Sequence, residues 1–266
     1  MELTVDGRKA YAYSGGKAFD ASLPCIVFIH GALNDHSVWT LLARWFAHHG
    51  HAVLALDLPG HGRSDGPPLA DVEALAGWVL ALLDAAGVRK AALIGHSMGS
   101  LIALEAAGRA PERADRLVML GTAVPMKVSD ALMHTSQRDP LKAIDMVNTF
   151  SHSGTASKPS YPGPGTWLHG SDRALMRRVQ AGQSGLNLFH HDFGICDRYE
   201  RGLAAAANVR CPATIVVGSR DQMTSPKQAA TIAKALNARV QSVDAGHSMM
   251  SEAPDAVLAA LRSAMA

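Results

Sequence analysis

The sequence predicts an α/β fold: a mostly parallel, doubly wound sheet with a helical insertion. Short, continuously apolar runs such as "CIVFIH" (25–30) and "AVLALD" (52–57) are typical of strands covered on both faces. Segments with helical spacing separate these runs, and strands that alternate with helices in this way predict right-handed βαβ units. The alternation stops after Gly121 and resumes at residue 213.

The interruption predicts how the chain is divided. We expect a sheet domain made of residues 1–123 and 201–266 and a mostly helical insertion at 124–200. Inside the insertion, helical patterns cover 129–137, 140–150 and 171–182, and a loop rich in proline and glycine covers 159–165.

The other elements follow in chain order. "TVDGRKAYAYS" (4–14) alternates around an Asp-Gly turn, which predicts an antiparallel hairpin at a sheet edge. Ser37 is the expected N-cap of the first helix and Gly50 its C′ residue, and Pro111 should end the helix that begins at Met98. Buried strands are expected at 25–30, 52–57, 91–95, 116–121, 213–218 and 239–244, and further helices at 37–50, 71–87, 98–110, 225–237 and 253–265.

Composition excludes several classes of protein. The chain has 266 residues, 48% hydrophobic and 18% charged, which is a globular composition near the upper size of one hydrophobic core. A net charge of +2 without a Lys/Arg-rich run argues against nucleic acid as a partner. We find no signal-peptide pattern and no apolar run of about 18 residues, so no membrane association is expected. Three well-separated cysteines, Cys25, Cys196 and Cys211, indicate reduced thiols and a cytoplasmic location.

The segment "ALIGHSMGSLIALEAA" (92–107) carries the strongest chemical signal. An apolar strand changes into a helix within a few residues, and Ser97 stands at the junction between Gly95 and Gly99. This Gly-x-Ser-x-Gly pattern between strand and helix is typical of a nucleophile elbow, in which a strained turn lifts the serine hydroxyl above the sheet. A glycine-rich turn with a helix-capping serine is the structural alternative. The strand before Ser97 and the helix after it favour the elbow.

A serine nucleophile needs a histidine base and an acid that orients the histidine. In a parallel sheet these groups meet at the carboxyl ends of the strands. His247 follows the last strand, in "VDAGHSMM", and is the expected base. Asp221, a few residues past the strand at 213–218, is the expected acid; Asp244 is the alternative, but it lies only three residues before His247. His48, His49 and His51 lie at an expected helix C-terminus. His190 and His191 in the insertion could form a metal pair, but no further ligand stands at the required spacing, so a surface pair is expected.

Acyl chemistry also needs donors for an oxyanion. The backbone N–H of Met98, directly after the nucleophile, is one expected donor. The other should come from the loop "HGALNDHSVW" (30–39), where we assign the Ala32 N–H, with Leu33 as the alternative. His30 is expected to brace this loop by hydrogen bonding.

Together these motifs resemble the α/β-hydrolase superfamily, in its capped esterase/lipase-like branch. The similarity runs from about residue 23 to the C-terminus and includes "HGALNDHSVW", "LALDLPGHGRSDGP", "GHSMGS", "VVGSRDQMTSP" and "GHSMMSEAPDAV". By resemblance, "DLPGHGRSDG" is a structural loop in which Asp57 and Arg63 brace turns, and His61 is not catalytic. A serine at 97 excludes the branches with an aspartate nucleophile, and the insertion corresponds to the cap domain that sets the substrate.

Together these predictions give one hypothesis for the function of the protein. We expect a serine hydrolase that cleaves small, largely apolar carboxylic esters with Ser97, His247 and Asp221, without a metal or an organic cofactor. Its partners are a small-molecule ester and water, and a homo-oligomer is compatible with the sequence. The substrate pocket is expected to include Leu33, Met126, Trp167 and Met249. Two alternatives stay open at this point: the same triad acting on an enol-lactone, a thioester or an activated carbon–carbon bond, and a ligand receptor without turnover.

Overall fold

The computed structural model describes residues 1–154, 167–182 and 185–266. The loop predicted at 159–165 lies outside these residues. An eight-stranded sheet forms the centre of the molecule, in the order β1-β2-β4-β3-β5-β6-β7-β8. β1 and β2 pair antiparallel with their neighbours, and all other pairs are parallel. The prediction of a mostly parallel α/β sheet is confirmed.

The strands lie where the sequence pattern places them. The edge hairpin turns at Asp6 and Gly7, which both have a positive φ, as an Asp-Gly hairpin turn requires. Strands β3 to β5 are buried at every residue, which explains their unbroken apolar runs. The strands are β1 Glu2–Val5, β2 Arg8–Tyr13, β3 Cys25–Ile29, β4 Ala52–Leu56, β5 Ala91–His96, β6 Ala114–Leu120, β7 Ala213–Gly218 and β8 Arg239–Val243.

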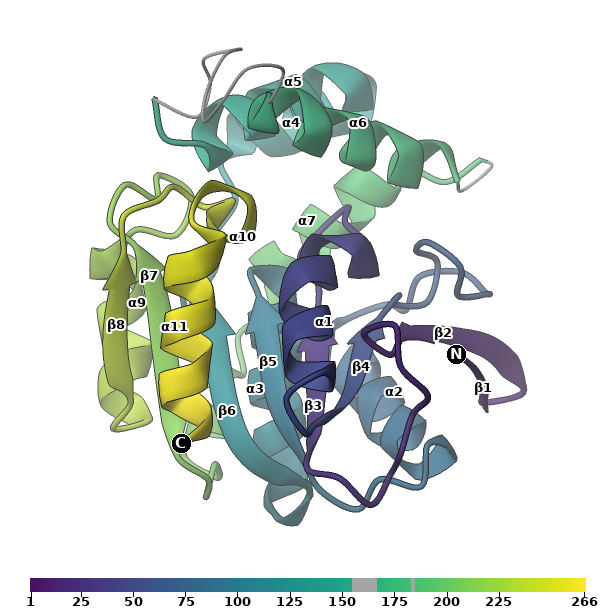
Figure 1. The fold of residues 1–266 in the computed structure, drawn as a ribbon. Helices are drawn as coiled ribbons and strands as arrows, with labels where there is room; N and C mark the ends of the chain where they lie inside the picture. Colours follow the sequence, from purple (N-terminus) through teal and green to yellow (C-terminus); the bar gives the residue numbers. More distant parts are fainter. Residues whose placement is uncertain (155–166, 183–184) are drawn as a thin grey trace.

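Helices cover both faces of the sheet (Figure 1). One face packs against α1 (Thr40–Ala47) and α11 (Pro254–Met265), and its core includes Phe28 and Trp39. The other face packs against α2 (Val72–Ala85), α3 (Met98–Arg109) and α9 (Pro226–Ala235). These two cores on opposite faces make the sheet doubly wound, as predicted.

In the described part of the chain between β6 and β7, four helices precede the short α8 (Gly202–Ala206). They are α4 (Asp130–Arg138), α5 (Pro140–Ser151), α6 (Leu168–Ala181) and α7 (Leu188–Arg198). In Figure 1, α4, α5 and α6 lie above the carboxyl ends of the strands, and α7 connects this layer to the sheet domain. Helices α7 and α8 are absent from the elements predicted in the sequence analysis.

The start of the first helix differs from its prediction. Residues His36–Trp39 form a 3-10 turn, and the N-cap is Asp35, whose Oδ1 accepts the Ser37 N–H at 2.9 Å. Ser37 is therefore the second residue of the turn and not its cap. Gly50 has a φ of +87°, as a residue after a helix C-terminus often does, although the helix C-cap is His48.

Candidate active site

The elbow has the geometry that its glycines make possible. Ser97 has φ 52° and ψ −120°, a strained conformation for a residue with a side chain. A Cβ on Gly95 would lie 2.0 Å from the Gly99 carbonyl oxygen, and a Cβ on Gly99 would lie 2.3 Å from the Ile29 carbonyl oxygen. Only glycine at 95 lets strand β5 approach helix α3 so closely, and only glycine at 99 lets α3 lie against the end of β3. Ser97 is left half-buried at the carboxyl edge of the sheet.

The register of the strands brings the predicted groups to one edge. Ile29 of β3 is paired with Gly95 of β5, so the loops that follow both strands begin at the same level. Gly31 consequently lies beside the elbow, where a Cβ would come within 3.2 Å of the Ser97 Cβ. β7 and β8 are likewise in register, with Gly218 opposite Val243. The loops that carry Asp221 and His247 therefore leave the sheet side by side.

Asp221 and His247 form a buried hydrogen-bonded pair. His247 Nδ1 lies 2.8 Å from Oδ2 of Asp221, and both residues are about 95% buried. The second carboxylate oxygen, Oδ1, accepts the Met223 and Thr224 N–H groups at 2.8 and 2.9 Å. Burial alone would raise the pKa of Asp221, but the His247 charge and these hydrogen bonds lower it to about 2.

This contact also determines the His247 tautomer. Because the carboxylate can only accept, Nδ1 carries a proton, and in the neutral ring Nε2 therefore keeps the lone pair. Thr224 lies against the same pair, since its hydroxyl donates to Asp221 Oδ2 at 2.8 Å. Asp244, the alternative acid, points elsewhere: its side chain is 82% exposed and forms an ion pair with Arg220.

His96 supports His247 from the elbow side. Its Nε2–H donates to the His247 carbonyl oxygen at 2.9 Å. Burial lowers the pKa of His96 to about 3, so the ring is neutral. Sequence reasoning treated this position only as the variable residue of the Gly-x-Ser-x-Gly pattern, and no local signal marks its contact 151 residues away.

The loop after β3 presents the predicted oxyanion donors. Among the residues that the structure describes, neither the Ala32 nor the Met98 N–H has an acceptor. Leu33, the alternative donor, is unsuitable, because its N–H already donates to Asp192 Oδ2 at 2.8 Å. His30 braces the loop as expected: it accepts the Leu58 N–H through Nε2 and donates to the Gly31 carbonyl through Nδ1. Burial lowers the pKa of His30 to about 4.

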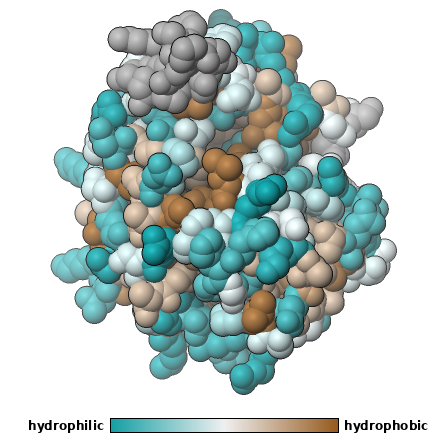
Figure 2. All heavy atoms as spheres, viewed as in Figure 1, coloured by the Kyte–Doolittle hydropathy of each residue, from teal (hydrophilic) through white to brown (hydrophobic). Residues whose placement is uncertain are grey.

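A cavity of about 680 Å³ opens above Ser97 and His247, between the sheet domain and the insertion. This volume suits a small organic ligand. In the middle of the face shown in Figure 2, apolar side chains gather at the surface where the insertion meets the sheet domain. The apolar lining comes from both parts of the chain: Leu41, Val147, Leu175, Met176, Phe193, Met223 and Met250.

The four side chains predicted for the pocket do not line this cavity. Leu33 and Met126 are buried in the larger core, and Met249 lies in the smaller one. Trp167 is 45% exposed and lies over Gly170 and against His169. Met249 shows the reason most clearly: its neighbours Ser248 and Met250 line the cavity, and the α10 turn (Met249–Glu252) points Met249 inward.

Two charged side chains of the insertion also line the cavity, and both are already paired. Arg178 donates to Asp35 at 2.7 Å, and Asp172 lies 3.0 Å from Nε2 of His152. Neither position was expected from the sequence. His190 and His191, expected at the surface, are instead half-buried and contact Ser136 and the Leu69 carbonyl.

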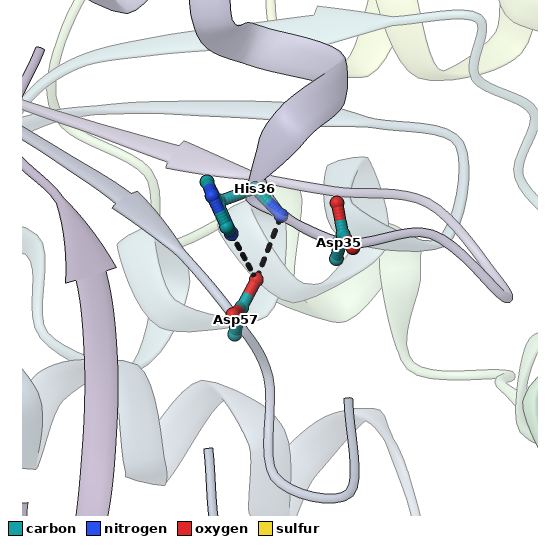
Figure 3. A group of neighbouring side chains, drawn as sticks. All are labelled: Asp35, His36 and Asp57. Atoms are coloured by element: carbon teal, nitrogen blue, oxygen red, sulfur yellow. Dashed lines mark hydrogen bonds and ion pairs between the residues drawn. The ribbon is translucent and has the colours of Figure 1, made fainter. Parts of the chain in front are cut away.

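One cluster in the described part of the chain has donor atoms close enough to hold a metal ion. The ligand atoms of Asp35, His36 and Asp57 lie within 4.8 Å of one another. Figure 3 draws two hydrogen bonds from His36 to Asp57, through the backbone N–H and the ring, and none to Asp35. The other Asp57 oxygen accepts the Arg63 N–H, as expected of a turn brace, and Arg178 binds Asp35. These hydrogen bonds account for the cluster.

Comparisons with known proteins place the chain in a family. The model of the alpha/beta hydrolase fold family matches residues 24–160, about half of the chain, and the chain therefore belongs to this family of hydrolases. The fold agrees with that of an enol-lactonase from Burkholderia xenovorans LB400. The TM-score is 0.85 at 22% identity, over 100% of this chain and 99% of that one.

Two curated relatives are similar over part of their length. The chain is 31% identical, over 87% of its residues, to the dihydrolipoyllysine-residue acetyltransferase component of the acetoin cleaving system of Pseudomonas putida. It is 36% identical, over 50% of its residues, to the sn-1-specific diacylglycerol lipase ABHD11 of Mus musculus. The chain spans only 60% and 44% of the lengths of these relatives. Among the described residues, no helix is long and apolar enough to cross a membrane.

Proposed function

We propose that the chain is a cytoplasmic serine hydrolase that cleaves small, neutral carboxylic esters, with residues 124–200 as its cap. The observation that carries the proposal is the His247–Asp221 hydrogen bond of 2.8 Å, in a cavity whose lining also includes the strained Ser97. A histidine with its Nδ1 proton held by a buried carboxylate has Nε2 available as a general base.

Each residue has a defined part in the reaction. Ser97 Oγ attacks the ester carbonyl carbon, while His247 Nε2 accepts the hydroxyl proton. The Ala32 and Met98 N–H groups bind the oxygen that becomes negative. When the tetrahedral intermediate collapses, His247 returns the proton to the leaving alcohol and an acyl-Ser97 ester remains. Water, activated in turn by His247, releases the acid.

The charges around the cavity support a neutral substrate. Arg178, the only lysine or arginine among the described lining residues, already binds Asp35, and Asp172 already faces His152. Among these described residues, an anionic substrate would find no unpaired cation. Recruiting Arg178 would leave Asp35, which is 96% buried, without its partner, and such an uncompensated buried charge is unfavourable.

The first experiment tests the nucleophile. A fluorophosphonate probe should label the wild-type chain and Ser171→Ala, in which another cavity serine is removed, but not Ser97→Ala. Labelling of Ser97→Ala, or an unlabelled wild type, would contradict the assignment. The probe also separates an enzyme from an inert ligand receptor.

A second experiment tests the substrate class. We expect kcat/KM for a neutral ester to exceed that for a matched ester with a carboxylate on its acyl side. A tenfold preference for the anionic ester, about 1.4 kcal/mol, would contradict the proposal. A panel of lactones and thioesters at the same concentrations shows whether another acyl bond is preferred.

A further inference from the structure

A buried carboxylate of the insertion reaches across to the loop that follows β3. Asp192, in the middle of α7, is 1% exposed. Its Oδ2 accepts the Leu33 N–H at 2.8 Å and lies 2.9 Å from Nε2 of His61. The next residue, Phe193, lines the cavity. Helix α7 thus contacts both the substrate space and the loop that carries Ala32.

The Leu33 contact holds an unusual backbone conformation. Leu33 has a φ of +55° and is completely buried, although residues with a side chain seldom adopt a positive φ. The Asn34 N–H donates to the Gly31 carbonyl at 3.3 Å, which closes a turn with Ala32 and Leu33 at its centre. The bond to Asp192 fixes the direction of the Leu33 N–H and therefore the plane of the Ala32–Leu33 peptide.

The preceding peptide is fixed from the other side. His30 donates to the Gly31 carbonyl oxygen at 2.8 Å. This carbonyl and the Ala32 N–H belong to the same planar trans peptide and point in opposite directions. With one peptide held by His30 and the next by Asp192, the direction of the Ala32 N–H is determined.

Asp192 has a positive partner in this buried place. The Pro59 carbonyl can only accept, so His61 Nδ1, 3.1 Å away, carries a proton, and the carboxylate faces the other ring nitrogen. Burial opposes a charged ring, but Asp192 outweighs it, and the pKa of His61 is raised. A buried carboxylate with such a partner accepts a strong, charge-assisted hydrogen bond from Leu33.

We propose that Asp192 is a positioning residue for the oxyanion-binding loop, so that α7 must be docked on the sheet domain before the Ala32 N–H is aligned for catalysis. The proposal rests on the proposed function. Asp192 touches no reacting atom and acts through Leu33 and the turn. Its sequence separation from Leu33, 159 residues, means that folding of the insertion completes the active site.

The test compares two substitutions at Asp192 with a control on the same helix. Asp192→Leu has a similar shape and cannot accept a hydrogen bond. It should lower kcat for a neutral ester about 10- to 100-fold, less than the loss of an oxyanion donor itself, with KM changed by less than about threefold. Asp192→Asn keeps an acceptor and should retain kcat within about fivefold. In the control Asp197→Leu, the lost contact is with the Val128 N–H, and kcat should not change.

A boronic acid forms a tetrahedral adduct with a serine nucleophile. Its affinity therefore reports on the oxyanion donors and distinguishes a positioning role of Asp192 from a merely structural one. Its affinity should fall by the same factor as kcat in Asp192→Leu and stay constant in Asp197→Leu. Wild-type kcat in Asp192→Leu, or equal losses in Asp192→Leu and Asp192→Asn, would overturn the proposal.

A measurement on the unmodified chain applies even if Asp192→Leu does not fold. In a crystal structure of the boronic acid adduct, the adduct oxygen should bind the Ala32 and Met98 N–H groups while Leu33 stays bound to Asp192. An oxygen bound to the Leu33 N–H instead would overturn the role of Asp192 and leave the hydrolase function intact. A wild type that shows neither turnover nor probe labelling would overturn the proposed function itself.

Discussion

Replacing Asp221 by asparagine should slow ester hydrolysis by a factor of about 10²–10⁴, because the substitution reverses the His247 tautomer. The structure determines how the new amide is oriented. Oδ1 accepts the Met223 and Thr224 N–H groups, so the amide oxygen must take that position. The amide nitrogen then stands where Oδ2 faced His247 and donates to Nδ1. The proton of His247 moves to Nε2, which can no longer accept a proton from Ser97.

The expected loss corresponds to about 3–5 kcal/mol of transition-state stabilisation. The same substitution should also destabilise the fold. The pKa of Asp221 is lowered from 3.8 to about 2, so its ionised form contributes up to about 2 kcal/mol to the free energy of unfolding while His247 is protonated, and the part due to hydrogen bonds remains when His247 is neutral. This stability is present above the unfolded-state pKa near 4. It is lost as the pH falls through the folded-state pKa near 2.

The assay is steady-state hydrolysis of a neutral p-nitrophenyl ester at pH 7.5, together with urea unfolding. Asp244→Asn is the matched control: it changes the same chemical group at the end of the adjacent strand, where the carboxylate is exposed. Its kcat should lie within about threefold of the wild type. Equal activity of Asp221→Asn and wild type, or a larger loss in Asp244→Asn, would refute the tautomer argument and transfer the acid role.

Three further results are expected. Ser97→Gly and Ser97→Ala should both be inactive. Ser97→Gly should nevertheless have the higher melting temperature, because glycine removes the strain of a positive φ, which costs about 1–3 kcal/mol. Equal melting temperatures would show that the elbow is not strained. Gly99→Ala should destabilise the fold by more than about 3 kcal/mol, since its Cβ would meet backbone oxygens at 2.3 and 2.5 Å. Gly77→Ala, in α2, should be neutral or stabilising, as a helix-interior alanine is favoured by about 0.5–1 kcal/mol. The ion pair of His61 with Asp192 stabilises the fold fully below the unfolded-state pKa of about 6.5 and less as the pH rises through the higher folded-state pKa. The unfolding free energy lost in His61→Gln should therefore be larger at pH 6 than at pH 9, and a constant difference would contradict the pairing.

The sequence alone was sufficient wherever the determining contacts are local. Alternation of buried strands with helices predicted the doubly wound sheet, because burial on both faces leaves continuous apolar runs. The Gly-x-Ser-x-Gly turn could be identified from five residues and its flanking elements. The same logic selected Asp221 and His247 as candidates, because residues just past the carboxyl ends of parallel strands must share one edge. Their catalytic roles stay predictions until the variants are measured.

Helix α7 shows where periodicity fails. Seven of its eleven residues are buried, and a carboxylate, Asp192, stands on the buried side, which obscures the amphipathic pattern. A charged residue on the buried side of a helix makes its sequence pattern look irregular. The identity of its neighbours, and not its own pattern, explains its position.

Only the tertiary structure decided which groups surround the reacting atoms. The proposal of Ala32 instead of Leu33 as the oxyanion donor depends on Asp192, which is 159 residues away from Leu33 and accepts its N–H. The cavity lining depends on tertiary contacts in the same way: Met249 turns inward while Met250 lines the cavity, and the insertion contributes Met176 and Phe193. Local sequence specifies which residues form a strand or a turn, whereas the direction of a side chain or an N–H depends on partners that only folding brings near.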